Sequence, residues 1–200
     1  MGFKNVGIKK ILKNNTHSTW LSTTDIDNIM MQFDKKYDHF TFKNTTPIDF
    51  DTWPREDIKH FSLRKEIEKS PTSRQFGFVF NTAPHGHSGK HWISMFVDLA
   101  PPLQRRPYIF YYDSTGHPIP QEIKKLRNRI MAQSRRLGIP LQYKHARFIM
   151  HQRGNTECGM FAIFMLISLL TNTKPIEYFT EKNPHLSNTK MIEARKVVFR

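Results

Sequence analysis

The alternation of apolar and polar residues along the chain predicts a central β-sheet. Three runs rich in β-branched and aromatic residues, a composition typical of strands, lie at 76–81, 91–99 and 108–113. Turns that contain glycine or proline separate these runs, so the simplest arrangement is a meander. A further strand is predicted over 141–150, and short strands or loop are predicted over 39–54.

Helices are predicted where apolar residues recur every three or four positions. Near the start of the chain, Thr23 or Thr24 can cap a helix. The apolar face of that helix consists of Ile26, Ile29, Met30 and Phe33. A charged stretch over 55–73 predicts another helix with a loop behind it, stopped by Pro71, and a last helix is predicted from about Asn188.

Two further helices differ in how their apolar residues are distributed. The segment 121–137 follows two prolines and is strongly basic, with one apolar face that can pack on the sheet. The residues of that face are Ile123, Leu126, Ile130 and Leu137, and those expected to point into solvent are Lys124, Lys125, Arg127, Arg129, Arg135 and Arg136. The segment 157–170 is instead apolar on nearly all sides, which predicts burial at the centre of the domain.

Length and charge limit the classes of protein that fit. The chain has 200 residues, which suits a single domain, and residues 1–18 are expected to form a basic arm or a short amphipathic helix. A formal net charge of +14 favours contact with polyanions such as DNA through counterion release. No apolar run reaches the ~18 residues that a bilayer span needs, and no signal-peptide core is present. A soluble, intracellular protein is therefore expected, and a single cysteine fits a reducing compartment.

Cys158 stands where a polar loop meets the apolar segment 157–170. A helix N-terminus favours a thiolate through its unpaired N–H groups and its partial positive charge. The competing interpretation is that a lone cysteine is only a small buried apolar residue. Because it is the only cysteine, it cannot form a disulfide within this chain.

A thiol nucleophile needs a base, a group that orients the base, and donors for the oxyanion. His91 begins one predicted strand and Asp113 ends the next, so in an antiparallel pair they would meet at one edge of the sheet. Gln152 has an amide that can donate to an oxyanion beside the backbone N–H of Cys158. Singly, these residues also fit a surface or core histidine, a turn former and a solvated amide. Their order and spacing together favour cysteine-protease chemistry.

Four motifs, taken in order along the chain, resemble those of a known family. The sequence contains Trp20-Leu21, Gly89-Lys90-His91-Trp92 followed by Phe96-Val97-Asp98, Tyr112-Asp113-Ser114-Thr115-Gly116, and Gln152 through Cys158-Gly159. Together they resemble the superfamily of ubiquitin-like-protein proteases and adenovirus proteases. Within it, the chain is most similar to the polyprotein proteases of African swine fever virus and related large DNA viruses.

The resemblance implies a role for each residue of this constellation. His91 would be the general base and later the general acid, Asp113 would orient it, and Cys158 would be the nucleophile. Gln152 and the Cys158 N–H would form the oxyanion hole. The African swine fever protease has asparagine where Asp113 stands, whereas SUMO proteases have aspartate, and an aspartate would hold the imidazolium more strongly.

The resemblance also implies the substrate. Trp20 and Trp92 would cover a narrow channel that admits only Gly-Gly before the scissile bond, because glycine lets the backbone approach closely. A core position on a strand is the alternative for Trp92. The substrates of the viral members are structural polyproteins cut during virion maturation, which implies a protein of the virion and of assembly sites in the host cytoplasm.

Other classes of protein share parts of this pattern. A protease that removes SUMO or ubiquitin-like modifiers is the nearest rival, because those tails also end in Gly-Gly. An inactive nucleic-acid-binding protein on the same fold is the rival from another class. His85, His87 and His91 lack a second group of ligands at zinc spacing, so no metal or other cofactor is expected. The prediction is a monomeric α+β cysteine endopeptidase with a central mixed sheet packed against the helix of Cys158.

Overall fold

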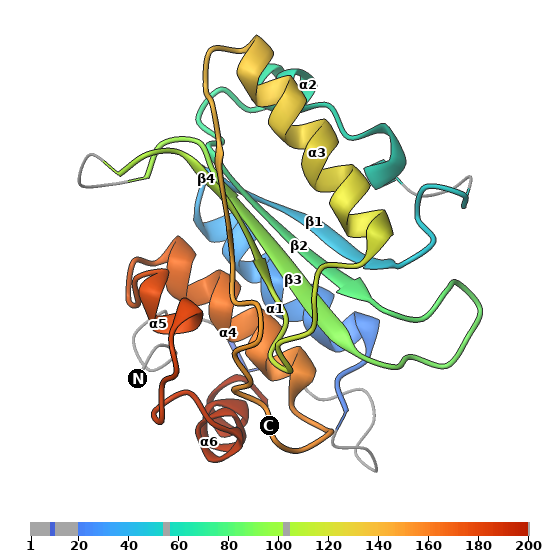
Figure 1. Ribbon diagram of the computed structural model, residues 1–200, viewed down its shortest axis with the longest axis vertical. Coiled ribbons are helices and arrows are strands. Elements are labelled where there is room, and N and C mark those ends of the chain that lie inside the picture. Colours follow the sequence, from blue (N-terminus) through green and yellow to red (C-terminus); the bar gives the residue numbers. More distant parts are fainter. Residues whose placement is uncertain (1–8, 11–19, 54–56, 102–104, 200) are drawn as a thin grey trace.

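The computed structural model describes residues 9–10, 20–53, 57–101 and 105–199, and a five-stranded sheet lies at its centre (Figure 1). The strands, in their order across the sheet, are β1 (Phe40–Pro47), β2 (Gln75–Asn81), β3 (Trp92–Asp98), β4 (Tyr108–Tyr112) and β5 (Gln142–His145). The middle three form the predicted antiparallel meander, whereas β1 runs parallel to β2 and β5 parallel to β4. The prediction of an α+β fold with a mixed sheet is confirmed.

Helices cover both faces of the sheet (Figure 1). One face carries α1 (Thr23–Lys36), α4 (Cys158–Leu170), α5 (Glu177–Thr180) and α6 (Asn188–Val198), and the other carries the 3-10 helix η1 (Asp57–His60), α2 (Leu63–Lys69) and α3 (Gln121–Arg136). Because side chains alternate along a strand, Trp92 and Phe96 join the first apolar layer, while Ile93 and Met95 join the second. Every residue of β3 and β4 is buried as a result.

The helix α4 forms the centre of the first apolar layer. All 13 of its residues are buried, which confirms the prediction drawn from its uniformly apolar sequence. Gly159 in its first turn allows the chain near Leu21 to approach closely, because a Cβ there would lie 3.1 Å from the Cβ and Cδ1 atoms of Leu21. The segment around Leu21 is therefore held against the N-terminus of α4.

The helix predicted near the start of the chain is α1, and its predicted apolar face is buried. Its cap, however, is Ser22 and not Thr23 or Thr24. The Ser22 hydroxyl accepts from the Asp25 N–H at 3.1 Å, and the Asp25 carboxylate accepts from the Ser22 N–H at 2.8 Å. This reciprocal pair places the cap one or two residues earlier than expected.

Two predicted elements are shorter in the structure. The strand predicted over 141–150 ends at His145, because Phe148 has a positive φ of 65° and its N–H donates to the Gly116 carbonyl outside the sheet. The region 55–73 contains η1 and the short α2, which Ser62 caps. The four-residue α5 was not predicted, because so short a helix has no measurable apolar period. The arm predicted for 1–18 lies outside the described residues except at 9–10.

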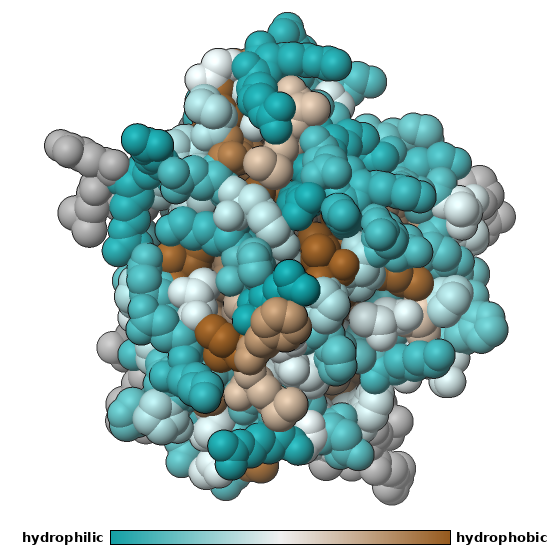
Figure 2. Space-filling model, viewed as in Figure 1, coloured by the Kyte–Doolittle hydropathy of each residue, from teal (hydrophilic) through white to brown (hydrophobic). Residues whose placement is uncertain are grey.

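The basic helix α3 packs on the second apolar layer as predicted, with two exceptions among its charges. Arg127 is half-buried, and its guanidinium lies 4.2 Å from the centroid of the Tyr143 ring. Arg129 does not point freely into solvent, because its guanidinium lies 3.2 Å from Asp51 Oδ1 and donates to the Ile58 carbonyl. Figure 2 shows that the surface over α3 is mostly hydrophilic. Within the described ranges, no helix is long and apolar enough to cross a membrane.

Candidate active site

His91 and Asp113 face each other at one end of the sheet. His91 directly precedes β3, and Asp113 directly follows the antiparallel neighbour β4. The His91 Nε2 and Asp113 Oδ1 atoms are 2.8 Å apart. Residues from two strand ends are thus brought into contact, as the antiparallel pairing requires.

Asp113 is a buried carboxylate with several donors around it. Thr115 donates to Asp113 Oδ1 through its backbone N–H at 2.8 Å and through its hydroxyl at 2.6 Å. Burial is the largest influence on the pKa of Asp113 and raises it, but the hydrogen bonds and charge of His91 and the bonds from Thr115 outweigh burial. The net pKa lies below the ordinary value, so Asp113 is ionised at neutral pH.

The protonated form of His91 is stabilised from two sides. Burial has the largest effect on the pKa of His91 and lowers it, but hydrogen bonds and negative charge from Asp113 and Cys158 raise the pKa from 6.5 to about 9. Because Nε2 faces Asp113, Nδ1 is the ring nitrogen that remains for Cys158. This geometry suits an imidazolium placed between a carboxylate and a sulfur anion.

Cys158 is the first residue of α4, and only 2% of its surface is exposed. The preceding residue, Glu157, makes no side-chain capping hydrogen bond. Its carboxylate binds Arg195 of α6 instead, at 2.8 Å. The first-turn N–H groups of α4 are therefore left without a side-chain cap beside the sulfur, where they favour negative charge.

Gln152 lies in the loop that precedes α4, with its side-chain amide fixed by two hydrogen bonds. Its Oε1 accepts from the Ser114 hydroxyl at 2.7 Å, and its Nε2 donates to the Gly154 carbonyl at 2.7 Å. An amide nitrogen has two hydrogens, so one N–H of Gln152 remains for another acceptor. The Gln152 backbone N–H also donates to the Ser114 carbonyl at 2.8 Å, which ties this loop to the turn after Asp113.

A glycine allows these two loops to meet. Gly116 has a φ of 78°, and a Cβ there would lie 3.0 Å from backbone atoms of Ile149. Its N–H donates to the Asp113 carbonyl, and its carbonyl accepts from the Phe148 N–H. The turn that holds Asp113 and the loop that holds Gln152 are therefore joined through backbone contacts.

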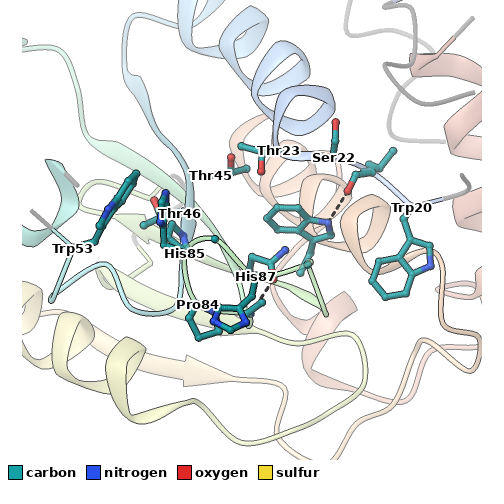
Figure 3. Close-up of a pocket in the computed structure, with 16 residues that line it drawn as sticks. Trp20, Ser22, Thr23, Thr45, Thr46, Trp53, Pro84, His85 and His87 are labelled. Carbon is teal, nitrogen blue, oxygen red and sulfur yellow. Dashed lines mark hydrogen bonds between the residues drawn. The ribbon is translucent and has the colours of Figure 1, made fainter. Parts of the chain in front are cut away.

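A groove with a volume of about 600 Å³ lies beside the strand ends, and Trp20 and Trp92 are among the residues that line it (Figure 3). Trp92 is 4% exposed and belongs to the core, and its Nε1 donates to the Leu21 carbonyl at 2.9 Å. Trp20 is half-buried. Trp92 thus serves the core and the groove at once, so the two interpretations of this residue do not exclude each other.

The far part of the groove contains residues that sequence reasoning did not assign to the site. Figure 3 shows Trp53 and His85 at the end opposite Trp20. Their rings stack with centroids 3.6 Å apart. None of the side chains that line the groove is formally charged, with histidine counted as neutral. No local sequence signal joins Trp53 to His85, because each lies in a different loop.

Ser114 and Thr115 were recognised in sequence only as parts of a motif. In the structure both side chains contact the site. The Ser114 hydroxyl donates to Gln152 Oε1, and the Thr115 hydroxyl donates to Asp113 Oδ1. The signal available in sequence was the Ser-Thr-Gly turn that follows the strand end. Among the described residues, no group of three or more His, Cys, Asp or Glu gathers in a way that could hold a metal ion. His85 stacks on Trp53, and His91 is bound to Asp113.

Comparisons of the sequence with known proteins identify a family. The model of the Ulp1 protease family, C-terminal catalytic domain, matches residues 13–199. The putative thiol protease R355 of Acanthamoeba polyphaga mimivirus is 29% identical over 185 residues, which cover 90% of this chain and 57% of that protein. The SUMO-1 cysteine protease S273R of African swine fever virus is 25% identical over 171 residues, 86% of this chain and 58% of that protein. This chain therefore spans less than two thirds of the length of both relatives.

Solved structures share the fold. The crystal structure of the African swine fever virus pS273R protease aligns with a TM-score of 0.81 at 23% identity, over 96% of this chain and 70% of that chain. The C-terminal Ulp1 protease domain in complex with Smt3, the yeast orthologue of SUMO, aligns with a TM-score of 0.56 at 15% identity, over 90% of this chain and 76% of that chain.

Proposed function

The chain belongs to the Ulp1 protease family, and from this premise we propose that it is an endopeptidase that cleaves after Gly-Gly in viral structural polyproteins during virion maturation. Family membership makes it a cysteine protease. The bond it cleaves, its substrates and its place in the virion and at cytoplasmic assembly sites are the proposal. The observation that carries it is the position of His91 between Asp113 and Cys158.

In the proposed reaction, the Cys158 thiolate attacks the carbonyl carbon of the scissile peptide. The electron pair of the carbonyl moves to its oxygen, which the free N–H of Gln152 and the backbone N–H of Cys158 stabilise. When the carbonyl re-forms, the C–N bond breaks and protonated His91 gives its proton to the leaving amine. Water, deprotonated by His91, then releases the acyl group from Cys158 as a carboxylic acid.

The aromatic residues of the groove support the proposed Gly-Gly specificity, although the lining of the groove itself includes none of His91, Gln152 and Cys158. Trp20 and Trp92 line the groove, and Trp92 is fixed by its bond to the Leu21 carbonyl. A rigid aromatic wall excludes side chains by size, whereas glycine passes because it has no Cβ. The uncharged lining favours a neutral peptide segment, even though the chain as a whole has a net charge of +14. The viral origin of the two sequence relatives supports a viral polyprotein as the substrate.

The second candidate function is removal of SUMO-like modifiers. It is favoured by the name of the African swine fever virus relative and by the Smt3 complex of the structural relative. Both substrates would be cut after Gly-Gly, so the two functions share one site and differ in what docks outside the groove. An inactive nucleic-acid-binding protein is the least favoured candidate, because the chain retains Gln152 and Cys158, and His91 interacts with both Asp113 and Cys158.

One experiment separates these functions. The full chain is incubated with a Gly-Gly-Xaa peptide library and with SUMO and ubiquitin fusions, with and without DNA. The proposal expects peptide cleavage after Gly-Gly that is abolished in Cys158→Ala and His91→Ala but measurable in Asp113→Asn. Cleavage of the fusions alone would establish the modifier protease instead. Equal abolition in all three variants would contradict the subordinate role of Asp113.

A thiol-reactive probe separates an enzyme from an inactive binder. Because Cys158 is the only cysteine, the labelling rate reports on this sulfur alone. The proposal expects labelling at neutral pH to slow in His91→Ala while the variant remains folded, since the imidazolium that favours the thiolate is lost. Equal rates in the wild type and in His91→Ala would contradict an activated thiolate.

The basic surface of α3 supports non-specific DNA binding as a part of the proposal. The exposed basic residues of this helix are Lys124, Lys125, Arg135 and Arg136. Arg129 instead forms an ion pair with Asp51. Contact with phosphates would concentrate the monomeric enzyme within an assembling particle and would weaken as salt rises. Binding to duplex DNA that is insensitive to salt would contradict this electrostatic account.

A further inference from the structure

A second hollow lies where β4 ends and α3 begins. It has a volume of about 300 Å³ and is lined by residues of the loop 117–119, the start of α3 and the segment 143–147. Strands β4 and β5 are parallel neighbours, and α3 connects them in sequence. The hollow is thus at the carboxyl edge of a strand–helix–strand unit, where ligands commonly bind in parallel sheets.

Three cationic side chains, Lys124, Arg127 and Arg147, line this hollow. Across the described ranges, none of them forms an ion pair with a carboxylate. His117 and His145 also line the hollow, and no aspartate or glutamate does. Burial, followed by the charges of Arg147 and Arg127, lowers the pKa of His145, in agreement with the convergence of the guanidinium groups. Such a cluster of unpaired positive charges favours an anion.

The start of α3 adds to this positive field. The helix has 16 residues and begins after Pro120, which makes no side-chain capping bond. Gln121, its first residue, lines the hollow. The N–H groups of the first turn and the positive end of the helix dipole therefore favour an acceptor-rich anion at this position.

A buried hydroxyl group indicates a ligand independently of the positive charges. Tyr111 lines the hollow, is 3% exposed, and has a hydroxyl with no hydrogen-bond partner in the described part of the chain. Burying an unbonded hydroxyl is unfavourable, so most such groups have a partner. An oxygen of a bound anion would accept from Tyr111, while the other oxygens would meet the cationic groups.

We propose that the hollow formed by Tyr111, Lys124, Arg127 and Arg147 at the start of α3 binds the phosphate group of a small soluble molecule. A tetrahedral dianion has several acceptor oxygens, which match a hydroxyl, an ammonium and two guanidinium groups. Duplex DNA fits less well, because its backbone would rest on the exposed side of α3 and would not reach the buried Tyr111 hydroxyl. The occupant would lie close to the catalytic turn, since Thr115 Oγ1 is 2.6 Å from both His117 Nδ1 and Asp113 Oδ1.

The test measures binding of inorganic phosphate to the full chain by calorimetry and by thermal unfolding, with chloride as the control at equal ionic strength. We expect a single phosphate site, and about fivefold to tenfold weaker binding in Lys124→Gln and Arg147→Gln. The matched control is Lys125→Gln, which removes an exposed lysine of the same helix outside the hollow. No phosphate effect beyond that of chloride, or an equal loss in Lys125→Gln, would overturn the proposal.

Tyr111→Phe is the sharpest variant, because it removes only the hydroxyl. Without phosphate, its melting temperature should equal or exceed that of the wild type, since the lost hydroxyl has no partner in the free protein. With phosphate, the stabilisation seen in the wild type should be largely lost. Retention of the full phosphate-dependent stabilisation in Tyr111→Phe would overturn the assignment of this hydroxyl to the site.

Two further ligands identify the source of the phosphate. Tighter binding of glycerol phosphate than of inorganic phosphate supports an ester as the occupant, and equal binding supports free phosphate. A short duplex DNA tests a polynucleotide as the occupant: DNA that displaces phosphate and binds more weakly in Tyr111→Phe and Lys124→Gln than in Lys125→Gln would overturn the proposal. DNA that binds without displacing phosphate occupies the separate basic surface of α3 and agrees with the proposal. These measurements use no peptide substrate. A negative result for phosphate binding therefore does not contradict the proposed peptidase function.

Discussion

The Nε2 atom of His91 lies 2.8 Å from Asp113 Oδ1, and this contact determines which ring nitrogen is left for Cys158. Asp113 is in turn held by the N–H and the hydroxyl of Thr115. The carboxylate therefore cannot rotate away without losing three donors. Orientation of the imidazole depends on this turn, so the chemistry of Cys158 is linked to the end of β4.

We expect the activity of the protein to fall as His91 loses its proton. The pKa of His91 is raised to about 9, so the imidazolium persists through neutral pH and is lost above about pH 9. Asp113→Asn removes a negative charge that supports the imidazolium, and should move the alkaline limb of the kcat/KM profile to lower pH. The profile is measured with a Gly-Gly peptide, and an alkaline limb that does not move would contradict the assigned contact.

The same shift predicts a pH dependence of stability. Because the folded-state pKa of His91 lies above its ordinary value of 6.5, its contribution to folding is fully present below that value and is lost as pH rises through about 9. Urea unfolding between roughly pH 6 and roughly pH 10 measures this decline. His91→Ala is the control, and should show a flatter dependence over the same interval.

The Gln152 amide should contribute to catalysis through its orientation as well as its presence. Gln152→Ala removes the donor and should lower kcat by about a hundredfold or more, as for other oxyanion-hole amides. Ser114→Ala keeps the amide but removes the hydroxyl that donates to its Oε1, so a smaller loss in kcat with little change in KM is expected. Steady-state kinetics on folded variants measures both, and a larger loss in Ser114→Ala than in Gln152→Ala would contradict the assignment.

Trp20 and Trp92 should differ in their effects on folding. Trp92 is 4% exposed and donates to the Leu21 carbonyl, so Trp92→Ala should lower the free energy of unfolding by about 3–5 kcal/mol. Trp20 is half-buried, so Trp20→Ala should cost much less stability but raise KM for a Gly-Gly peptide. Urea unfolding and peptide kinetics are compared for both variants. If Trp20→Ala had the same kcat and KM as the wild type, the assignment of Trp20 to substrate binding would be wrong.

Two glycines with similar backbone angles should respond differently to alanine. Gly116 and Gly138 have φ angles of 78° and 73°, so Gly→Ala carries a similar conformational cost of about 1–2 kcal/mol at each. A Cβ at Gly138 would meet nothing within 4 Å, whereas one at Gly116 would press on the backbone of Ile149 at 3.0 Å. Gly116→Ala should therefore be the more destabilising variant and should also lower kcat, because Gln152 follows Ile149 in the same loop. Equal unfolding free energies would show that the two loops are not tightly joined.

Regular elements were predictable because they depend on short-range periodicity. The strands β2, β3 and β4 and the apolar helix α4 each have a pattern that one window of sequence reveals. The contact between His91 and Asp113 was predictable because the two strands that carry them were expected to be antiparallel neighbours. The proposed catalytic roles came from ordered motifs, since no single residue type identifies a catalytic group.

Contacts between distant loops could not be predicted in this way. The end of β5 depends on a bond from Phe148 to Gly116, and the orientation of Gln152 depends on Ser114. The stack of Trp53 on His85 likewise joins two loops that lack a periodic pattern. Such contacts form only once the sheet has brought the loops together, so a short window of sequence does not predict them.

Glu157, the residue directly before Cys158, forms a buried ion pair with Arg195 of α6. Their closest atoms are 2.8 Å apart, and the side chains of Glu157 and Arg195 are only 3% and 16% exposed. Arg195→Ala would leave a buried carboxylate without its partner, so we expect a loss of about 3–5 kcal/mol in the free energy of unfolding. Because α6 packs against α4, this loss should appear as lower stability and not as lower kcat of the folded protein.

A double-mutant cycle distinguishes the pair from two independent residues. Glu157→Gln removes the charge, and Arg195→Met removes the guanidinium but keeps an unbranched side chain. The double variant should lose less stability than the sum of the single losses, because neither partner is then left as an unpaired buried charge. Urea unfolding of the four proteins gives the coupling free energy. Strictly additive losses would mean that the ion pair does not hold α6 to the start of α4, and a fall in kcat in the folded Arg195→Met protein would mean that Arg195 also acts on Cys158.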